Sequence, residues 1–353
     1  MTDLTHISNS FVKLGSFFQE YYEYSKNNTE INSNQQSWFQ KFDEAITLSG
    51  HKNGWFTKEN ILYSLKSWAE QLTAENLEEW LSTYEIEKNQ PKTVAIVMAG
   101  NIPLVGFHDF LSTLITGNRI LIKLSSNDSV LLPCVAQYLI EIEPTFKDKI
   151  DFTDGKLDAF DAVIATGSNN TSRYFEHYFS KKPNLIRKSR NSVAVLTNNE
   201  TKEQLTALGE DIFRYYGLGC RSISKIFVPR DYNFDQLYEA IYSYKDILDQ
   251  AKFSNNYDYN KAVYLMSEYK ILDNGFLMLK EDTNYASPIA TLFYEYYDSL
   301  EELKNKLTAN SDRLQCIVAD GVLKDEVKFG HTQKPSLKDY ADNIDTVEFL
   351  IKT

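Results

Sequence analysis

Apolar side chains recur at helical spacing through the first ninety residues of the chain. Phe11, Leu14, Phe17 and Tyr21 follow one such pattern, and residues 61–72 repeat it. A spacing of three and four residues is typical of helices with one buried face. We therefore expect residues 1–90 to form a helical N-terminal region that packs on the domain after it.

The pattern changes after residue 90 to short apolar runs that alternate with helical segments. Strands are predicted at residues 93–98, 119–124, 159–165 and 192–197, with helices at 103–116, 130–142 and 170–179. Strand and helix alternating at this rhythm predict a doubly wound parallel sheet. We assign residues 91–197 to a Rossmann-like nucleotide-binding domain of an α/β protein.

A second α/β layer is predicted from residue 198 to residue 330. Its expected helices are residues 202–215, 234–248 and 299–309, and its expected strands are 224–228, 276–280, 289–296 and 314–319. We interpret this layer as a catalytic domain. Residues 331–353 form a C-terminal segment that we expect to take part in oligomerisation.

Net charge, hydropathy and cysteine content exclude several classes of binding partner and of protein. The net charge of −12 over 353 residues provides no broad basic field, so nucleic acid is not an expected partner. No run approaches the ~20 apolar residues of a membrane span. Three cysteines at unrelated spacings predict neither a disulfide framework nor a metal cluster, and we expect no bound metal and a cytoplasmic location.

One cysteine has the setting of a nucleophile. Cys220 follows Gly217 and Gly219 between a predicted helix and a predicted strand, and glycines allow close approach of the backbone to a ligand. A thiol in a polar turn can be activated for covalent chemistry. Cys134 and Cys316 stand within apolar runs and are interpreted as small core residues.

Four short segments, in order, resemble the motifs of aldehyde dehydrogenases. They are Gly100-Asn101-Ile102-Pro103-Leu104 after a strand, Gly117-Asn118 leading to Lys123-Leu124-Ser125, the turn Thr166-Gly167-Ser168, and Gly217-Leu218-Gly219-Cys220. Within that superfamily the chain most resembles the acyl-CoA reductases typified by the reductase of bacterial bioluminescence. The resemblance covers about residues 91–350, includes residues 329–333, and implies an aldehyde-dehydrogenase-like fold.

The resemblance implies a catalytic role for two residues. Cys220 would attack the carbonyl of an acyl-CoA, and the side-chain amide of Asn101 would donate to the oxyanion together with the Cys220 backbone N–H. Without the resemblance, Asn101 is better interpreted as a turn residue that caps the following helix. The resulting acyl-enzyme would be reduced by a nicotinamide cofactor to an aldehyde.

The resemblance also implies a cofactor site. Lys123, Ser125 and Ser126 would contact the adenine ribose or its phosphate. The turn Thr166-Gly167-Ser168 would offer backbone N–H groups to the pyrophosphate or nicotinamide side. Aldehyde dehydrogenases carry a glutamate where Ser126 stands, so a 2′-phosphate meets no carboxylate there. We therefore expect NADPH as cofactor, with NADH as an alternative.

The chain also departs from the hydrolytic aldehyde dehydrogenases at the residue that activates water. Hydrolytic relatives carry Glu-Leu-Gly-Gly-Lys, with the glutamate as base, where this chain has Ile186, Arg187, Lys188, Ser189 and Arg190. Hydrolysis of an acyl-enzyme therefore lacks its base, and coenzyme A is the expected acyl carrier. The resemblance further suggests a homo-oligomer and a complex with acyl-transfer enzymes.

Two rival functions remain open. An acyl-phosphate reductase would need a basic pocket beside Cys220, for which Arg187, Lys188, Arg190 and Arg221 are candidates. A non-catalytic acyl- or nucleotide-binding subunit of a multienzyme complex is the other. Of the histidines, His177 is interpreted as a surface or packing residue. His331 could border the active site or cap a turn.

Overall fold

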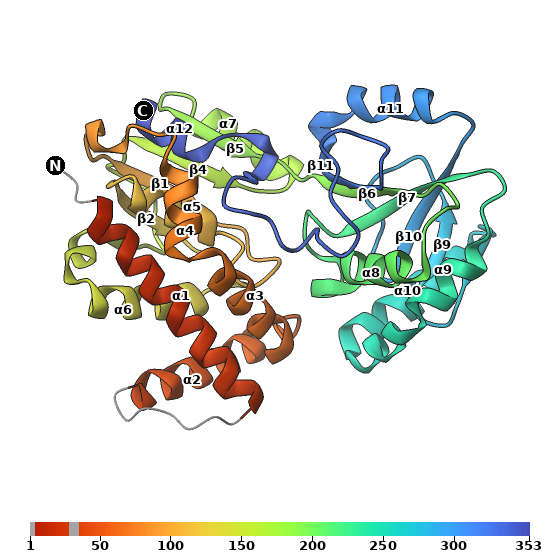
Figure 1. Ribbon diagram of the computed structural model, residues 1–353, viewed down its shortest axis with the longest axis horizontal. Helices are drawn as coiled ribbons and strands as arrows, with labels where there is room; N and C mark the ends of the chain where they lie inside the picture. The colour runs from red at the N-terminus through yellow and green to blue at the C-terminus, as the bar shows by residue number, and fades with distance from the viewer. Residues whose placement is uncertain (1–3, 28–34) are drawn as a thin grey trace. The chain divides into compact units, whose positions relative to one another are not determined.

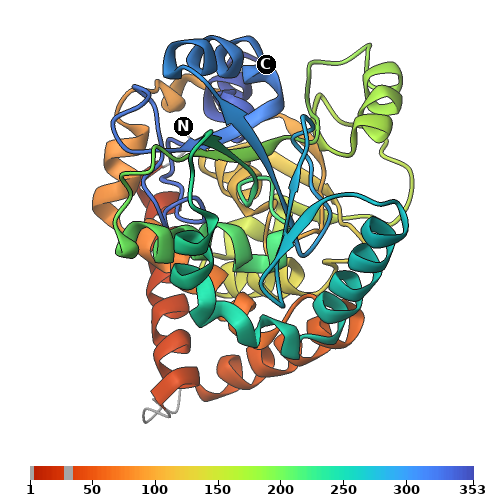
Figure 2. The same cartoon turned by 90° about the vertical axis from the view of Figure 1, so that its right-hand side faces the viewer.

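The computed structural model describes residues 4–27 and 35–353. The chain divides into two compact units, the first made of residues up to Lys188 together with Ser336–Thr353, and the second of Ser189–Pro335. Each unit is an α/β layer around its own sheet (Figures 1 and 2). No helix in the described parts combines the length and the apolar character that crossing a membrane requires.

The first unit holds a parallel five-stranded sheet in the order β3-β2-β1-β4-β5. Its strands are β1 (Thr93–Val97), β2 (Arg119–Lys123), β3 (Ile150–Phe152), β4 (Ala162–Thr166) and β5 (Asn184–Arg187). Its helices are α1 (Leu4–Asn27), α2 (Gln36–Lys52), α3 (Lys58–Gln71), α4 (Ala74–Leu81), α5 (Phe107–Ile115), α6 (Leu131–Ile142), α7 (Asn169–Tyr178) and α12 (Thr346–Lys352).

The strand pleat assigns the two faces of this sheet to different helices. Val94 and Ile96 point into the large core formed with α1–α6 and α12. Ala95, one residue out of phase, belongs to a smaller cluster with Phe175 of α7 and with Phe179. The helical N-terminal region predicted from the sequence is therefore present, and its aromatic positions build the larger core.

The second unit holds a six-stranded sheet in the order β11-β6-β7-β10-β9-β8, parallel except for the β8-β9 pair. Its strands are β6 (Asn191–Val195), β7 (Ile223–Pro229), β8 (Ile271–Asp273), β9 (Met278–Glu281), β10 (Thr291–Tyr297) and β11 (Leu314–Val318). Its helices are α8 (Lys202–Phe213), α9 (Phe234–Ile241), α10 (Ala251–Met266) and α11 (Leu300–Ala309). Helix α11 packs Leu303 and Leu307 on one face of the sheet, and Figure 1 shows α8–α10 on the other.

Two expectations about elements require correction. The strand expected at residues 192–197 exists as β6, but it pairs with β7 and β11 in the second sheet and not with the nucleotide-binding sheet. The helix expected from Pro103 begins only at Phe107, because Leu104 has a positive φ of 56° within the preceding turn. The first correction concerns the sheet to which a correctly predicted strand belongs, and the second concerns the turn that precedes a helix.

Candidate active site

The first sheet has a reversal of strand order at its centre. From β1 the chain moves outward through β2 to β3, and it then returns to β4 beside β1 and continues to β5. In such sheets the loops at the carboxyl ends of the two central strands diverge and leave a crevice for ligands. Gly100 and Asn101 follow β1, and Thr166, Gly167 and Ser168 lie at the end of β4. The predicted cofactor and oxyanion residues of this unit therefore share one sheet edge.

Gly100 is packed directly against the loop after β2. A Cβ at this position would stand 2.6 Å from both Cβ and Oγ of Ser125 and 3.1 Å from the backbone nitrogen of Asp128. The Ser125 hydroxyl accepts the N–H of Asn127 at 3.2 Å. Two segments that the sequence treated as parts of one site are thus in contact, and only glycine fits at the junction.

Asp128 is a buried acid that the sequence reasoning missed. Its Oδ2 accepts the N–H of Leu104 at 3.0 Å, while Oδ1 is buried without a hydrogen-bond partner. Burial raises the pKa of Asp128 to about 6, against the opposing effect of the Leu104 hydrogen bond. The carboxyl therefore fixes the turn that carries Gly100 and Asn101.

Lys123 is the last residue of β2 and is partly buried, and Ser126 lies in the loop that follows. The Lys123 ammonium donates to the carbonyl oxygen of Gly155 at 2.9 Å, and Ser126 is exposed. Lys123 pairs in register with Val97 at the end of β1, which places it on the same edge as Gly100. This edge of the sheet therefore carries the Lys123 cation, and the Ser126 position carries no carboxylate.

The turn after β4 starts a helix. Ser168 caps α7 by accepting the N–H of Thr171 at 3.2 Å, and the N–H of Gly167 donates to Arg187 O at 3.2 Å. A Cβ on Gly167 would come within 3.0 Å of Thr171 and Phe175. The positive end of the α7 dipole thus lies at the carboxyl end of β4.

The basic residues proposed for a phosphate pocket already have protein partners. Arg187 is buried and pairs with Asp109 at 2.5 Å, and it also donates to Thr346 at 2.8 Å. Lys188 pairs with Glu176 at 2.8 Å. Arg190 donates to the carbonyl oxygen of Leu314 at 3.2 Å, and Arg221 donates to that of Thr332 at 2.8 Å. These contacts disfavour a basic pocket for an acyl phosphate.

Cys220 lies in the second unit, in a tight turn that ends an unusual backbone segment. After α8, Tyr215, Tyr216 and Gly217 have successive positive φ angles of 55°, 58° and 75°. Positive φ in bulky residues is rare and persists only where the surrounding structure enforces it, often at functional sites. The N–H of Ser222 then closes a turn on Gly219 O at 3.0 Å, with Cys220 exposed within it.

The three cysteines differ in exposure. Cys220 is exposed, whereas Cys134 on α6 and Cys316 on β11 are partly buried. Burial raises the pKa of Cys134 to about 11 and also raises the pKa of Cys316, which lies 3.0 Å from the hydroxyl of Ser192. That hydroxyl also donates to Cys220 O at 2.9 Å. The interpretation of Cys134 and Cys316 as packing residues agrees with their burial.

Residues 329–333 lie beside the Cys220 turn. Arg221 Nε donates to Thr332 O at 2.8 Å, and the side chain of Gln333 donates to Ser222 Oγ at 3.3 Å. His331, which the sequence left undecided, is exposed, and its Nδ1 lies 2.9 Å from Phe329 O of its own turn. His177 is exposed on α7, as expected for a surface residue.

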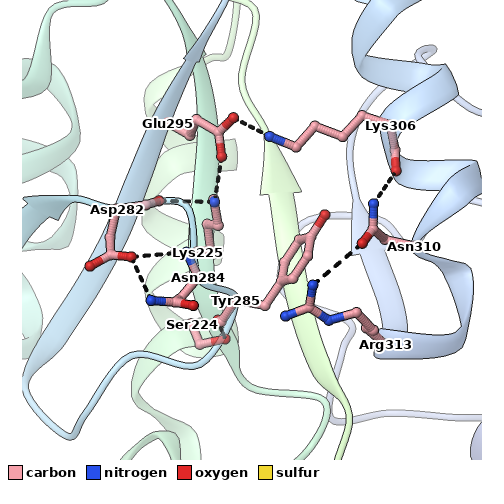
Figure 3. Close-up of polar contacts among 9 residues, drawn as sticks. All are labelled: Ser224, Lys225, Asp282, Asn284, Tyr285, Glu295, Lys306, Asn310 and Arg313. Atoms are coloured by element: carbon pink, nitrogen blue, oxygen red, sulfur yellow. Dashed lines mark hydrogen bonds and ion pairs between the residues drawn. The ribbon is translucent and has the colours of Figure 1, made fainter.

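The strand that follows Cys220 is anchored by an ion cluster around the buried Lys225 (Figure 3). Lys225 of β7 is fully buried, donates to Asp282 O at 2.9 Å and pairs with Glu295 of β10 at 2.6 Å. Lys306 of α11 pairs with the other oxygen of Glu295. Burial lowers the pKa of Lys225, and the Glu295 carboxylate opposes that effect. The cluster holds the start of β7, and so one end of the Cys220 turn, to β10.

Comparison with known families gives a match over most of the described chain. The family model described as acyl-CoA reductase (LuxC) matches residues 20–243. A long-chain acyl-protein thioester reductase 2 of Photobacterium leiognathi is 24% identical over 216 residues, which is 56% of this chain and 45% of the relative. A long-chain acyl-protein thioester reductase of Aliivibrio fischeri is 24% identical over 226 residues, 58% of this chain and 47% of the relative.

Solved structures give the same fold. An indole-3-acetaldehyde dehydrogenase in complex with NAD+ superposes with a TM-score of 0.61 at 14% identity, covering 89% of this chain and 72% of that one. An aldehyde dehydrogenase from Bacillus cereus in its NAD+ complex gives a TM-score of 0.59 at 14% identity, with 90% and 72% covered. The fold is therefore that of aldehyde dehydrogenases, as the sequence predicted.

Proposed function

This chain belongs to the acyl-CoA reductase (LuxC) family of the aldehyde dehydrogenase superfamily, and on that basis we propose that it reduces a long-chain acyl thioester to an aldehyde. The acyl group is carried by Cys220 during the reaction. The observation that supports this most directly is the Cys220 turn, where an exposed thiol follows a strained glycine-containing segment and is held by neighbouring residues.

The chemistry at Cys220 is an acyl transfer. The thiolate attacks the thioester carbonyl, a carbon–sulfur bond forms, and the bond to the carrier thiol breaks so that the carrier leaves as a thiolate. The Cys220 backbone N–H is the proposed first donor to the oxyanion of the tetrahedral intermediate. Arg221 and Ser222 support this position because both are held by residues 332 and 333.

Asn101 is the proposed second oxyanion donor, as its motif implies. It lies in the first unit, in the turn that Asp128 and Ser125 hold, whereas Cys220 lies in the second unit. Removing one oxyanion donor typically lowers kcat 10²–10³-fold. Asn101→Ala should therefore slow acyl transfer to about that extent while leaving the unfolding transition in place.

The edge of the first sheet fits a nicotinamide dinucleotide. Gly100 and Gly167 keep the backbone free of side chains at the strand order reversal, and the α7 N-terminus offers a positive dipole. Lys123, Ser125 and Ser126 are proposed to hold the adenine ribose and its phosphate, and Thr166, Gly167 and Ser168 the pyrophosphate side. When bound, the cofactor supplies the hydride that brings the acyl group to the aldehyde level. We propose NADPH, since no carboxylate stands at Ser126.

Water is a poor acceptor for the acyl group in this arrangement. General-base assistance typically contributes 10²–10⁴-fold, and residues 186–190 contain no carboxylate. Arg187 within that stretch is bound to Asp109 and Thr346 and so serves the fold of the first unit. The acyl-enzyme should therefore hydrolyse slowly and persist until it reacts with hydride or with a carrier thiol.

The proposal also concerns the carrier, the thiol compound that delivers the acyl group to Cys220. Coenzyme A is our first candidate, and the two acyl-protein thioester reductases that resemble this chain make a protein-bound acyl group the second. A protein carrier would also make an acyl-transfer enzyme the expected partner. Both carriers present the same acyl thioester to Cys220.

The test is a turnover assay with acyl-CoA thioesters of increasing chain length and with a protein that carries the same acyl chain as a thioester. Loss of NADPH absorbance and aldehyde formation are followed together for the wild type, Cys220→Ala and the matched control Cys134→Ala. We expect aldehyde from the wild type and the control, and none from Cys220→Ala. Binding of both ligands without any aldehyde would instead support a non-catalytic subunit, and turnover restricted to acyl phosphate would support that rival reductase.

A further inference from the structure

Asp211 is a charged residue in the last turn of α8 whose location is unfavourable for a carboxylate. Its side chain is completely buried, and a negative charge near a helix C-terminus opposes the helix dipole. Burial raises the pKa of Asp211 to about 6, even though three hydrogen bonds act in the opposite direction. An acid kept in such surroundings needs a compensating role.

The hydrogen bonds of Asp211 all go to one segment. Oδ2 accepts the N–H of Gly330 at 2.6 Å, and Oδ1 accepts both the N–H and the hydroxyl of Thr332 at 2.9 Å. Thr332 is itself fully buried, and Gly330 has a positive φ of 80° with Ala207 against its Cα. One carboxylate therefore fixes the backbone of residues 330–332 on α8.

The same segment holds the two residues that follow Cys220. The carbonyl oxygen of Thr332 accepts from Arg221 Nε at 2.8 Å, and the next residue, Gln333, donates to Ser222 Oγ at 3.3 Å. The Gln333 amide also lies 3.7–3.8 Å from where a Cβ of Gly219 would stand. A continuous chain of contacts thus runs from Asp211 through residues 330–333 to both sides of Cys220.

We propose that Asp211 is a positioning residue for Cys220, acting through residues 330–333, and this inference rests on the proposed acyl transfer by Cys220. Asp211 does not touch the substrate. It sets the backbone of the turn, and with it the direction of the Cys220 N–H and thiol. Placement errors of about 1 Å at a reacting group can lower rates by about two orders of magnitude.

The experiment compares Asp211→Asn with Asp273→Asn. The second variant is a matched control, because Asp273 lies in the same unit and likewise accepts a backbone N–H, that of Gly275 at 2.9 Å, and a hydroxyl, that of Tyr257. Amide hydrogen exchange is measured on the peptides that contain residues 215–221 and residues 329–334. Acylation of Cys220 is measured by mass spectrometry with a p-nitrophenyl ester, which requires neither acyl-CoA nor cofactor.

For Asp211→Asn we expect faster exchange in both peptides and acylation slowed by about tenfold or more. A side-chain amide keeps one acceptor oxygen only, so its NH2 group must face either the Gly330 N–H or the Thr332 donors. Asp273→Asn should keep the wild-type acylation rate and exchange faster only around its own turn. Thr332→Val keeps Asp211 and removes one donor, so it should slow acylation by less. Thr332→Ser, which retains the hydroxyl, should restore the wild-type rate.

Three results would overturn the proposal, and they differ in meaning. Normal acylation in Asp211→Asn, with a wild type that reacts, would show that Asp211 does not position the thiol and would leave the proposed function intact. A wild type whose Cys220 does not react with the ester would remove the proposed function and the positioning role together. Unchanged exchange of the 215–221 peptide would break the link between Asp211 and the turn.

Discussion

A substitution of Arg187 tests whether this residue stabilises the fold or binds a phosphate ligand. Arg187 is 5% exposed, and its guanidinium pairs with Asp109, which is also 5% exposed, while a second nitrogen donates to Thr346 of α12. Arg187→Met keeps the side-chain length and removes the charge. The Asp109 carboxylate would then be buried without its cation.

Removal of one partner of a buried ion pair typically costs about 3–5 kcal/mol. The pair also leaves Arg187 Nε and Asp109 Oδ1 without hydrogen-bond partners, so an apolar replacement of both residues should recover much of that loss. We therefore expect Arg187→Met to lower the free energy of unfolding by about 3–5 kcal/mol, and the double variant with Asp109→Leu to lower it by clearly less.

Tryptophan fluorescence is the assay, because all four tryptophans, Trp38, Trp55, Trp68 and Trp80, belong to the first unit. With a slope of about 2 kcal/mol/M in urea, the single variant should shift the midpoint by about 1.5–2.5 M. A midpoint within about 0.3 M of the wild type would refute the structural role, since the slope would then imply less than 1 kcal/mol. Binding of an acyl phosphate by the wild type that is lost in Arg187→Met at unchanged stability would also refute the structural role.

Three further predictions use the same protein. Ser126→Glu should shift cofactor preference from NADPH toward NADH, because a carboxylate repels a 2′-phosphate; tight binding of NADH alone by the wild type would contradict it. Asp128→Asn should flatten the pH dependence of stability. The pKa of Asp128 in the folded state, about 6, exceeds its ordinary value, so the wild type loses stability as pH rises from about 4 to 6. The variant should not lose stability over this range, as measured by urea midpoints at each pH. The acyl-enzyme formed without cofactor should persist in buffer and disappear when coenzyme A is added; rapid release of free acid would mean that a base replaces the missing glutamate.

Local pattern was sufficient to predict most elements of the first unit. The apolar runs that became β1, β2 and β4 were predicted to within a few residues, because each is a buried strand flanked by turn residues. Helix α10 (Ala251–Met266) was missed because its buried stripe is made of aromatic and polar residues, while apolar and aromatic residues such as Tyr259 and Leu265 are exposed on it. The sheet to which β6 belongs could not be predicted, since a buried strand has the same pattern in either sheet.

The sequence named candidate site residues, which stay predictions, but it did not name the residues that support them in the structure. Motif order singled out Cys220, Gly100 and the turn after β4. Asp211, an acid within the predicted helix 202–215, and Asp128, just before the predicted helix 130–142, gave no clear signal, because the role of each depends on backbone groups distant in sequence. The positive φ angles of Tyr215 and Tyr216 have no sequence signature, because tyrosine ordinarily avoids that conformation.

The most direct test of the central claim is the site of acylation. The protein is incubated with a long-chain acyl-CoA in the absence of cofactor, digested with trypsin and analysed by mass spectrometry. Cleavage after Arg214 and Arg221 releases residues 215–221, which contain Cys220 and no other cysteine. We predict a single acyl adduct on this peptide, removed by coenzyme A. Acyl groups on the peptides of Cys134 or Cys316, or no adduct at all, would contradict the account.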